Sequence, residues 1–251
     1  MNYKITVQYD GTSYKGWQLQ KNTDNTIQGK LQNILSRLVE KDVTVIGSGR
    51  TDAGVHAVGQ VANFHIDDIT MSDEELLLYI NSHLPKDIAV IALEKVDDDF
   101  HSRYNAVSKT YRYRIHTSPI ADVFNKKYVY TYTDMPLDID KMKKAADFLT
   151  GTHDFRSFCG NRHMKKSTVR TITDITIKEI VNEGYTSEIT IDYTGDGFLQ
   201  NMIRIITGTL IEIGTSRRSP SDITNIINAC DREAAGYTAP PQGLCLMNVK
   251  Y

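Results

Sequence analysis

The order of periodic segments along the chain constrains its fold more than any other feature of the sequence. Apolar and polar residues alternate at 3–9, which indicates a strand, and apolar residues recur at helical spacing over 27–38. Thr26 is a typical N-cap for that helix, and Ser72 with Glu75 forms a capping box ahead of a second helix. Further strands are predicted at 43–46, 58–66 and 88–96. The first hundred residues therefore read β-α-β-β-α-β.

The second half of the chain repeats this order. We expect strands at 109–116, 170–180, 185–193 and 244–249, a turn at 182–184, a helix after the N-cap Asp138, a periodic helix at 198–213 and a short helix capped by Ser219. Two such repeats predict an α+β fold of two ferredoxin-like units, joined through their sheets with a central cleft. The expected lobes are 1–100 and 101–251. A cleft with walls from both halves is a common place for a site.

Composition supports a folded chain in a reducing compartment. Of 251 residues, 40% are hydrophobic and 24% are charged, close to the average for globular domains. The three cysteines form no C-x-x-C pair, which disfavours both a disulfide framework and a cysteine-rich zinc module. No apolar run approaches the roughly 18–20 residues that span a bilayer, and the N-terminus does not resemble a signal peptide. We therefore expect a cytoplasmic protein with no membrane partner.

Positive charge is gathered locally, although the formal net charge is only -2. The windows 101–114 and 161–170 each hold four Lys or Arg residues and no acid. Such windows can bind a polyanion if they share one face, but solvated loops explain each of them equally well. Candidate phosphate contacts in the second window are Lys165, Lys166 and Arg170.

The densest group of chemically capable residues is the segment 47–57, GSGRTDAGVHA, between two expected strands. Its first eight residues include three glycines, which let a backbone turn sharply and let a ligand approach closely. Asp52 is flanked by small residues and follows Arg50 by two positions, an arrangement that core packing explains poorly. A hairpin loop in which Asp52 bonds backbone amides is the structural alternative. The segment lacks the ending of a Walker A motif.

The same segment resembles the G-R-T-D-A-G-V-H-A motif of the tRNA pseudouridine synthase A family. Other family motifs follow in the same order along the chain: YDGTxYxGWQxQ at 9–20, FHSR at 100–103, KxYxY at 109–113, GFLxNMIR at 197–204 and APPxGL at 239–244. The resemblance therefore spans nearly the whole sequence. The departures are Ser102, Ile203 and Cys245, and none of them falls on a charged or nucleophilic position of the motifs.

The resemblance implies isomerisation of uridine to pseudouridine in the anticodon stem-loop of tRNA, at positions 38, 39 and 40. It implies no metal and no small-molecule cofactor, and a homodimer that binds tRNA through a shared groove. Asp52 matches the catalytic aspartate of the family. A carboxylate can attack carbon or stabilise positive charge on the ribose, and the sequence leaves both routes open.

Three further residues take roles by resemblance, and His56 takes one from its position beside a glycine turn. Arg204 matches the buried arginine that pairs with the aspartate, and its apolar neighbours argue against a solvated helix position. Tyr111 matches the active-site tyrosine, which can stack on uracil and exchange a proton at C5. Arg50 matches the arginine that holds the target base out of the stack. His56 is expected to orient the loop rather than to contact RNA, although both remain open.

Two other functions compete with this one. A non-catalytic RNA-binding protein built from tandem RRM-like units would display aromatic residues on its sheets, but it has no use for the Arg50–Asp52 loop. A hydrolase would need a second carboxylate beside Asp52, and the sequence places no other acid in a comparable setting. We expect the isomerase.

Overall fold

A computed structural model describes residues 1–67, 69–161, 163–181 and 187–251. The turn predicted at 182–184, and Arg162 of the second basic window, lie outside the described residues. The chain forms two compact units, one of Met1–Val107 with Cys245–Tyr251 and one of Ser108–Leu244. Among the described residues, no helix has the length and apolar character needed to cross a membrane.

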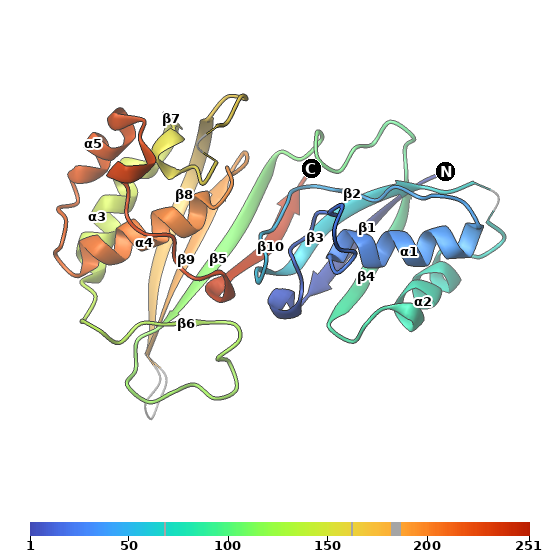
Figure 1. Cartoon of the computed structure of the whole chain (residues 1–251), viewed down its shortest axis with the longest axis horizontal. Helices are drawn as coiled ribbons and strands as arrows, with labels where there is room; N and C mark the ends of the chain where they lie inside the picture. Colours follow the sequence, from blue (N-terminus) through green and yellow to red (C-terminus); the bar gives the residue numbers. More distant parts are fainter. Residues whose placement is uncertain (68, 162, 182–186) are drawn as a thin grey trace. The chain divides into compact units, whose positions relative to one another are not determined.

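The described residues of the first unit form β-strands and two α-helices (Figure 1). Its elements are β1 (Asn2–Tyr9), α1 (Ile27–Val39), β2 (Ile46–Gly47), β3 (His56–His65), α2 (Asp73–His83), β4 (Ile88–Val96) and β10 (Leu244–Lys250). The central strand β1 lies antiparallel between β4 and β3. The other edge of β3 is shared by β2, which is antiparallel to it, and β10, which is parallel. The predicted order β-α-β-β-α-β is confirmed.

Local signals explain why these segments fold as they do. Tyr3, Ile5 and Val7 of β1 are fully buried and alternate with partly exposed or exposed residues, as the period of a strand requires. The Thr26 side chain accepts a hydrogen bond from the Gly29 amide at 3.1 Å and so caps α1. The capping box of Ser72 is formed with both of its hydrogen bonds.

The strand predicted at 43–46 is mostly absent, because α1 satisfies its backbone groups instead. The Val43 amide donates to the Ser36 hydroxyl at 2.9 Å, and the Val45 amide donates to the Gln32 side chain at 3.2 Å. The Val45 carbonyl accepts from the Gln28 side chain at 2.8 Å. A backbone whose donors and acceptors are already used cannot extend the ladder, so only β2 joins the sheet.

The described residues of the second unit form mostly antiparallel strands and three α-helices (Figure 1). Its elements are β5 (Ser108–His116), β6 (Tyr130–Thr131), α3 (Ile139–Leu149), β7 (Gly151–Asp154), β8 (Val169–Val181), β9 (Ser187–Gly195), α4 (Met202–Gly214) and α5 (Asp222–Ala229). The strand order is β5-β9-β8-β7, and β6 pairs in parallel with β5. The predicted α+β class is confirmed, and β5, β9 and β8 repeat the order of β1, β3 and β2.

Two helix starts differ from the sequence prediction. Helix α4 begins at Met202 rather than 198, because Asn201 takes a left-handed conformation with φ of 58°. Helix α5 begins at Asp222 rather than at Pro220; the preceding Ser221 makes no side-chain capping hydrogen bond, and the Ser219 amide donates to the Asp222 carboxylate at 2.8 Å. Strand β10 pairs in parallel with β3 and belongs almost entirely to the first compact unit, and the lobes at 1–100 and 101–251 stay a prediction.

Candidate active site

The loop between β2 and β3, which carries Asp52, is anchored on both sides of that residue. The Thr51 hydroxyl shares a buried hydrogen bond of 2.8 Å with the Tyr9 hydroxyl. The Thr51 carbonyl accepts from the Trp17 amide at 3.0 Å, and the Asp52 carbonyl accepts from the Val55 amide at 3.1 Å. Because hydrogen bonds hold the backbone on each side of Asp52, they fix the position from which its partly exposed side chain projects.

Close backbone approaches define the position of this loop. Gly16 has φ of +92°, and a Cβ there would lie only 2.6 Å from the Thr51 carbonyl oxygen. A Cβ on Gly11 would overlap the Val55 carbonyl oxygen. Only glycine fits where two backbones pack this closely. The YDGTxYxGW segment therefore packs against the Asp52 loop and supports it. The sequence analysis did not predict this contact.

The start of the loop is held by a buried polar pair. The Ser48 hydroxyl donates to the Gln60 side chain at 2.8 Å, and the Gln60 amide group donates to the Gly49 carbonyl at 3.0 Å. Arg50 is exposed, and its Nε donates to the Gln18 side chain at 3.1 Å. The guanidinium therefore lies at the surface of the first unit, on the same short loop as Asp52.

His56 lies at the first residue of β3 and is 4% exposed. Its Nδ1 lies 3.1 Å from the Gly11 amide nitrogen and 3.2 Å from a carboxylate oxygen of Asp10. A neutral ring accepts the Gly11 hydrogen bond, and a protonated ring pairs with Asp10. Either state ties the turn at Gly11–Ser13 to the end of the loop, which agrees with an orienting role. A contact of His56 with RNA stays a prediction.

Tyr111 lies on β5 in the second unit and is 6% exposed. Its ring meets the ring of Phe198 edge to face, with centroids 5.4 Å apart and planes at 85°. Two residues along the strand, Tyr113 is fully buried and its hydroxyl donates to the Pro240 carbonyl at 2.7 Å. Burial raises the pKa of Tyr113 above its usual range, although the charge of Arg204 lowers it in part.

Arg204 lies in the first turn of α4 and is half-buried. Its Nε donates to the Ala239 carbonyl at 2.7 Å, and a terminal nitrogen donates to the Asn201 side chain at 3.0 Å. The Ala239 amide returns a hydrogen bond to the Arg204 carbonyl at 3.0 Å. These contacts fix the guanidinium in one orientation, so Arg204 is not a solvated helix residue.

The two basic windows differ in how their charges are used. Arg112 forms a bidentate pair with Asp192, with distances of 2.7 and 2.8 Å, and Arg114 pairs in the same way with Glu188 at 2.7 Å. Both pairs cross from β5 to β9, so these guanidinium charges are compensated. The sequence did not reveal this, because each partner is more than 70 residues away.

The second window keeps more of its charge at the surface. Lys165 and Lys166 are exposed. Arg170 is half-buried and donates to its neighbouring carbonyls, those of Ser167 at 3.0 Å and Val169 at 2.6 Å. The charges of both lysines therefore lie at the surface, whereas the Arg170 guanidinium is hydrogen-bonded within its own turn.

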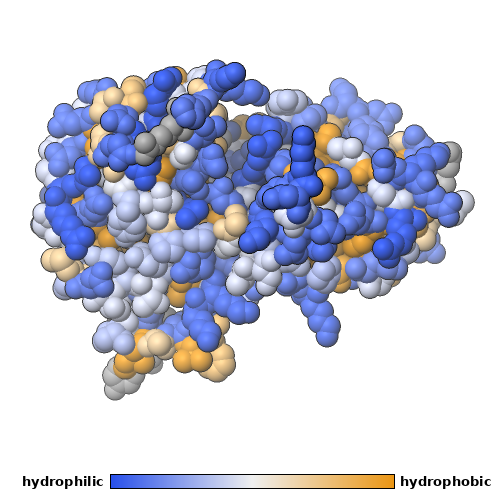
Figure 2. Space-filling model, viewed as in Figure 1, coloured by the Kyte–Doolittle hydropathy of each residue, from blue (hydrophilic) through white to orange (hydrophobic). Residues whose placement is uncertain are grey.

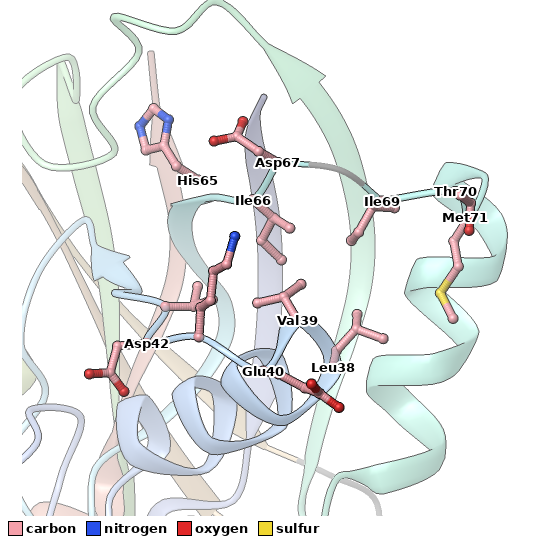
Figure 3. A pocket seen from close by; sticks show the side chains of 12 residues that line it. Leu38, Val39, Glu40, Asp42, His65, Ile66, Asp67, Ile69, Thr70 and Met71 are labelled. Atoms are coloured by element: carbon pink, nitrogen blue, oxygen red, sulfur yellow. The ribbon is translucent and has the colours of Figure 1, made fainter.

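A cavity of about 470 Å³ lies elsewhere in the first unit, between the end of α1 and the segment after β3 (Figure 3). Apolar side chains such as Val39 and Ile66 form its floor, and the carboxylates of Glu40 and Asp67 stand at its rim. None of the predicted site residues lines it. Within the described ranges, no three His, Cys, Asp or Glu side chains are grouped so that they could hold a metal ion.

Comparison with known proteins places the chain in a family. A sequence profile described as tRNA pseudouridine synthase matches residues 5–105 and 145–251. A tRNA pseudouridine synthase A of Limosilactobacillus reuteri is 45% identical over 99% of this chain and 96% of its own length. A protein of the same name from a Bacillus strain is 44% identical over 100% and 99%. A tRNA pseudouridine synthase A 1 of Clostridium tetani is 46% identical over 100% and 99%. The chain therefore belongs to the tRNA pseudouridine synthase family.

Among solved structures, a chain from the crystal structure of a Cbf5-Nop10-Gar1 complex aligns with 97% of this chain. The TM-score is 0.38, the sequence identity is 13%, and the alignment covers 48% of that chain. A likeness at this level adds nothing to the family membership.

Proposed function

We propose that this chain isomerises uridine to pseudouridine in tRNA, with Asp52 as the catalytic carboxylate. The C1′–N1 bond breaks, the uracil turns, a C1′–C5 bond forms, and the proton on C5 is replaced by one on nitrogen. Substrate and product have the same composition, so no oxidant or co-reactant is required. The observation that supports this most is the Asp52 loop, which is anchored at Thr51 and Val55 and lies within the family match.

The loop geometry suits either chemical role of Asp52. An ionised carboxylate is needed both to attack carbon and to stabilise positive charge on the ribose. We propose that Arg204 pairs with Asp52 and keeps it ionised, since a guanidinium nearby lowers the pKa of a carboxyl group. The fixed orientation of Arg204 supports this role. Tyr111 would stack on the target uracil, because its ring is already held against Phe198.

Base extraction and tRNA binding need further residues. Arg50, exposed beside Asp52, would hold the target base out of the stack, since neither C1′ nor the base faces can be attacked inside a helix. Lys165, Lys166 and Arg170 would contact phosphates and position the tRNA without reading its sequence.

The remaining parts of the proposal concern target and assembly. The expected targets are the uridines at positions 38, 39 and 40 of the anticodon stem-loop. The expected assembly is a cytoplasmic homodimer of two-lobed subunits, each with a central cleft. Sequence identity over full length to proteins named tRNA pseudouridine synthase A supports tRNA as the substrate. Sedimentation of the protein with and without tRNA tests the dimer.

The decisive experiment compares Asp52→Ala with the wild type on unmodified tRNA transcripts, mapping pseudouridine at nucleotide resolution. Asp52→Ala should lose pseudouridine formation and keep its tRNA affinity. Asp147→Ala, at an exposed position of α3, is the matched control and should behave as wild type. A wild-type protein that binds tRNA and modifies none would instead be the RRM-like binder, and an active Asp52→Ala would refute the assignment of the carboxylate.

A further inference from the structure

The turn that follows β4 displays an aromatic pair at the surface of the first unit. Tyr104 is 78% exposed, and its ring lies against the ring of His101, with centroids 4.2 Å apart and planes tilted by 33°. A ring this exposed contributes little to the core. The contact with His101 leaves most of the Tyr104 ring open to a partner, and we call this aromatic pair the platform.

Hydrogen bonds inside the turn fix the aromatic pair. The His101 Nδ1 accepts from the Arg103 amide at 3.1 Å and from the Tyr104 amide at 3.3 Å. The His101 amide donates to the Asn105 side chain at 2.6 Å, and the His101 carbonyl accepts from the Tyr104 and Asn105 amides at 3.1 and 3.0 Å. The imidazole therefore both supports the Tyr104 ring and holds the backbone that carries it.

Ser102, which is fully buried, fixes this turn to the sheet. The Ser102 amide donates to the Asn63 side chain at 3.0 Å, and its hydroxyl donates to the Ile46 carbonyl. The Ser102 carbonyl accepts from the Tyr251 hydroxyl at 2.7 Å. Three separate segments of the first unit thus hold Ser102, so the backbone that carries Tyr104 is rigidly held.

We propose that the exposed ring of Tyr104 stacks on an unpaired base of the tRNA substrate, outside the catalytic residues. An aromatic ring held in place before binding loses little entropy when a base stacks on it. The exposed Arg103 beside it suits a nucleotide. The exposed acids Asp97, Asp98 and Asp99 precede the turn, and their negative charge opposes a contact with phosphate. The face of a base is therefore a better partner for Tyr104 than the phosphate backbone of the RNA.

This inference rests on the proposed function, because it takes tRNA as the partner. A stacked base is worth about 1–3 kcal/mol by alanine substitution, which is a loss of about 5-fold to 140-fold in affinity. Tyr104→Ala should raise Kd and KM for tRNA by that factor and leave kcat at saturating tRNA unchanged. Tyr104→Phe keeps the ring and should bind as wild type, whereas Tyr104→Leu keeps apolar area without a π face and should resemble the alanine variant.

One further measurement and one control variant separate stacking from other roles of Tyr104. The slope of log Kd against log salt should be the same for wild type and Tyr104→Ala, since no phosphate contact is lost. Phe124→Ala is the control for removal of an exposed ring. Phe124 is 93% exposed in the loop between β5 and β6, where hydrophobic residues gather at the lower left of Figure 2.

The results that would overturn the inference are distinct from failure of the proposed function. Unchanged tRNA affinity in Tyr104→Ala, or a loss in kcat alone, would show that the ring does not bind a base. A shift in sedimentation of Tyr104→Ala without loss of tRNA affinity would assign the turn to a protein contact and would also refute it. A wild-type protein that makes no pseudouridine would contradict the function, whereas its tRNA affinity would still test the platform.

Discussion

Replacement of Gly16 by alanine should impair catalysis more than it impairs folding. Gly16 has φ of +92°, and a left-handed conformation costs an L-residue about 1–2 kcal/mol. The new Cβ would also lie 2.6 Å from the Thr51 carbonyl oxygen, well inside van der Waals contact, so the backbone before Asp52 must shift by several tenths of an ångström. Because a misplacement near 1 Å can cost about 10²-fold in rate, we expect kcat to fall by roughly 10- to 100-fold.

Gly151→Ala is the matched control for this substitution. Gly151 has φ of +112°, but a Cβ there would meet only the His153 ring, at 3.4 Å. This variant should lose about 1–2 kcal/mol of unfolding free energy in urea and keep its kcat. Single-turnover pseudouridine formation, measured at saturating tRNA, then isolates the displacement of the loop. If Gly16→Ala kept kcat within about twofold of Gly151→Ala, the claim that backbone packing positions Asp52 would be wrong.

Other predictions follow from charges at the surface. Lys165→Ala and Lys166→Ala should each weaken tRNA binding at all sequences and lower the salt slope of log Kd by about 1, and an unchanged slope would remove them from the tRNA interface. Glu75 has its pKa lowered from 4.5 by the hydrogen bond from the Ser72 amide. The capping box should therefore contribute its full stability above pH 4.5 and lose it as the pH falls through the lowered folded value. Urea unfolding of wild type and Glu75→Ala should converge in acid, and a gap independent of pH would contradict the cap.

Residues with local partners behaved as their sequence predicted. Thr26, Ser72 and Asp138 all cap helices, because an N-cap bonds an amide only two or three residues away. Ser219 shows the limit of this reasoning. Helix α5 begins at Asp222, two residues after the predicted first position at Pro220, and the Ser219 amide donates to the Asp222 carboxylate.

The local order of elements and the position of Asp52 on a loop before β3 were therefore set by the amino-acid sequence, through side-chain periodicity and capping within a few residues. The tertiary structure decided what depends on distant partners. In the folded chain, the backbone at 43–45 is hydrogen-bonded to side chains of α1 instead of to a strand. Arg112 pairs with Asp192 across 80 residues, and the Tyr251 hydroxyl donates to the Ser102 carbonyl across 149 residues. Which distant groups meet depends on how the whole chain packs, and a one-dimensional pattern carries no direct record of that.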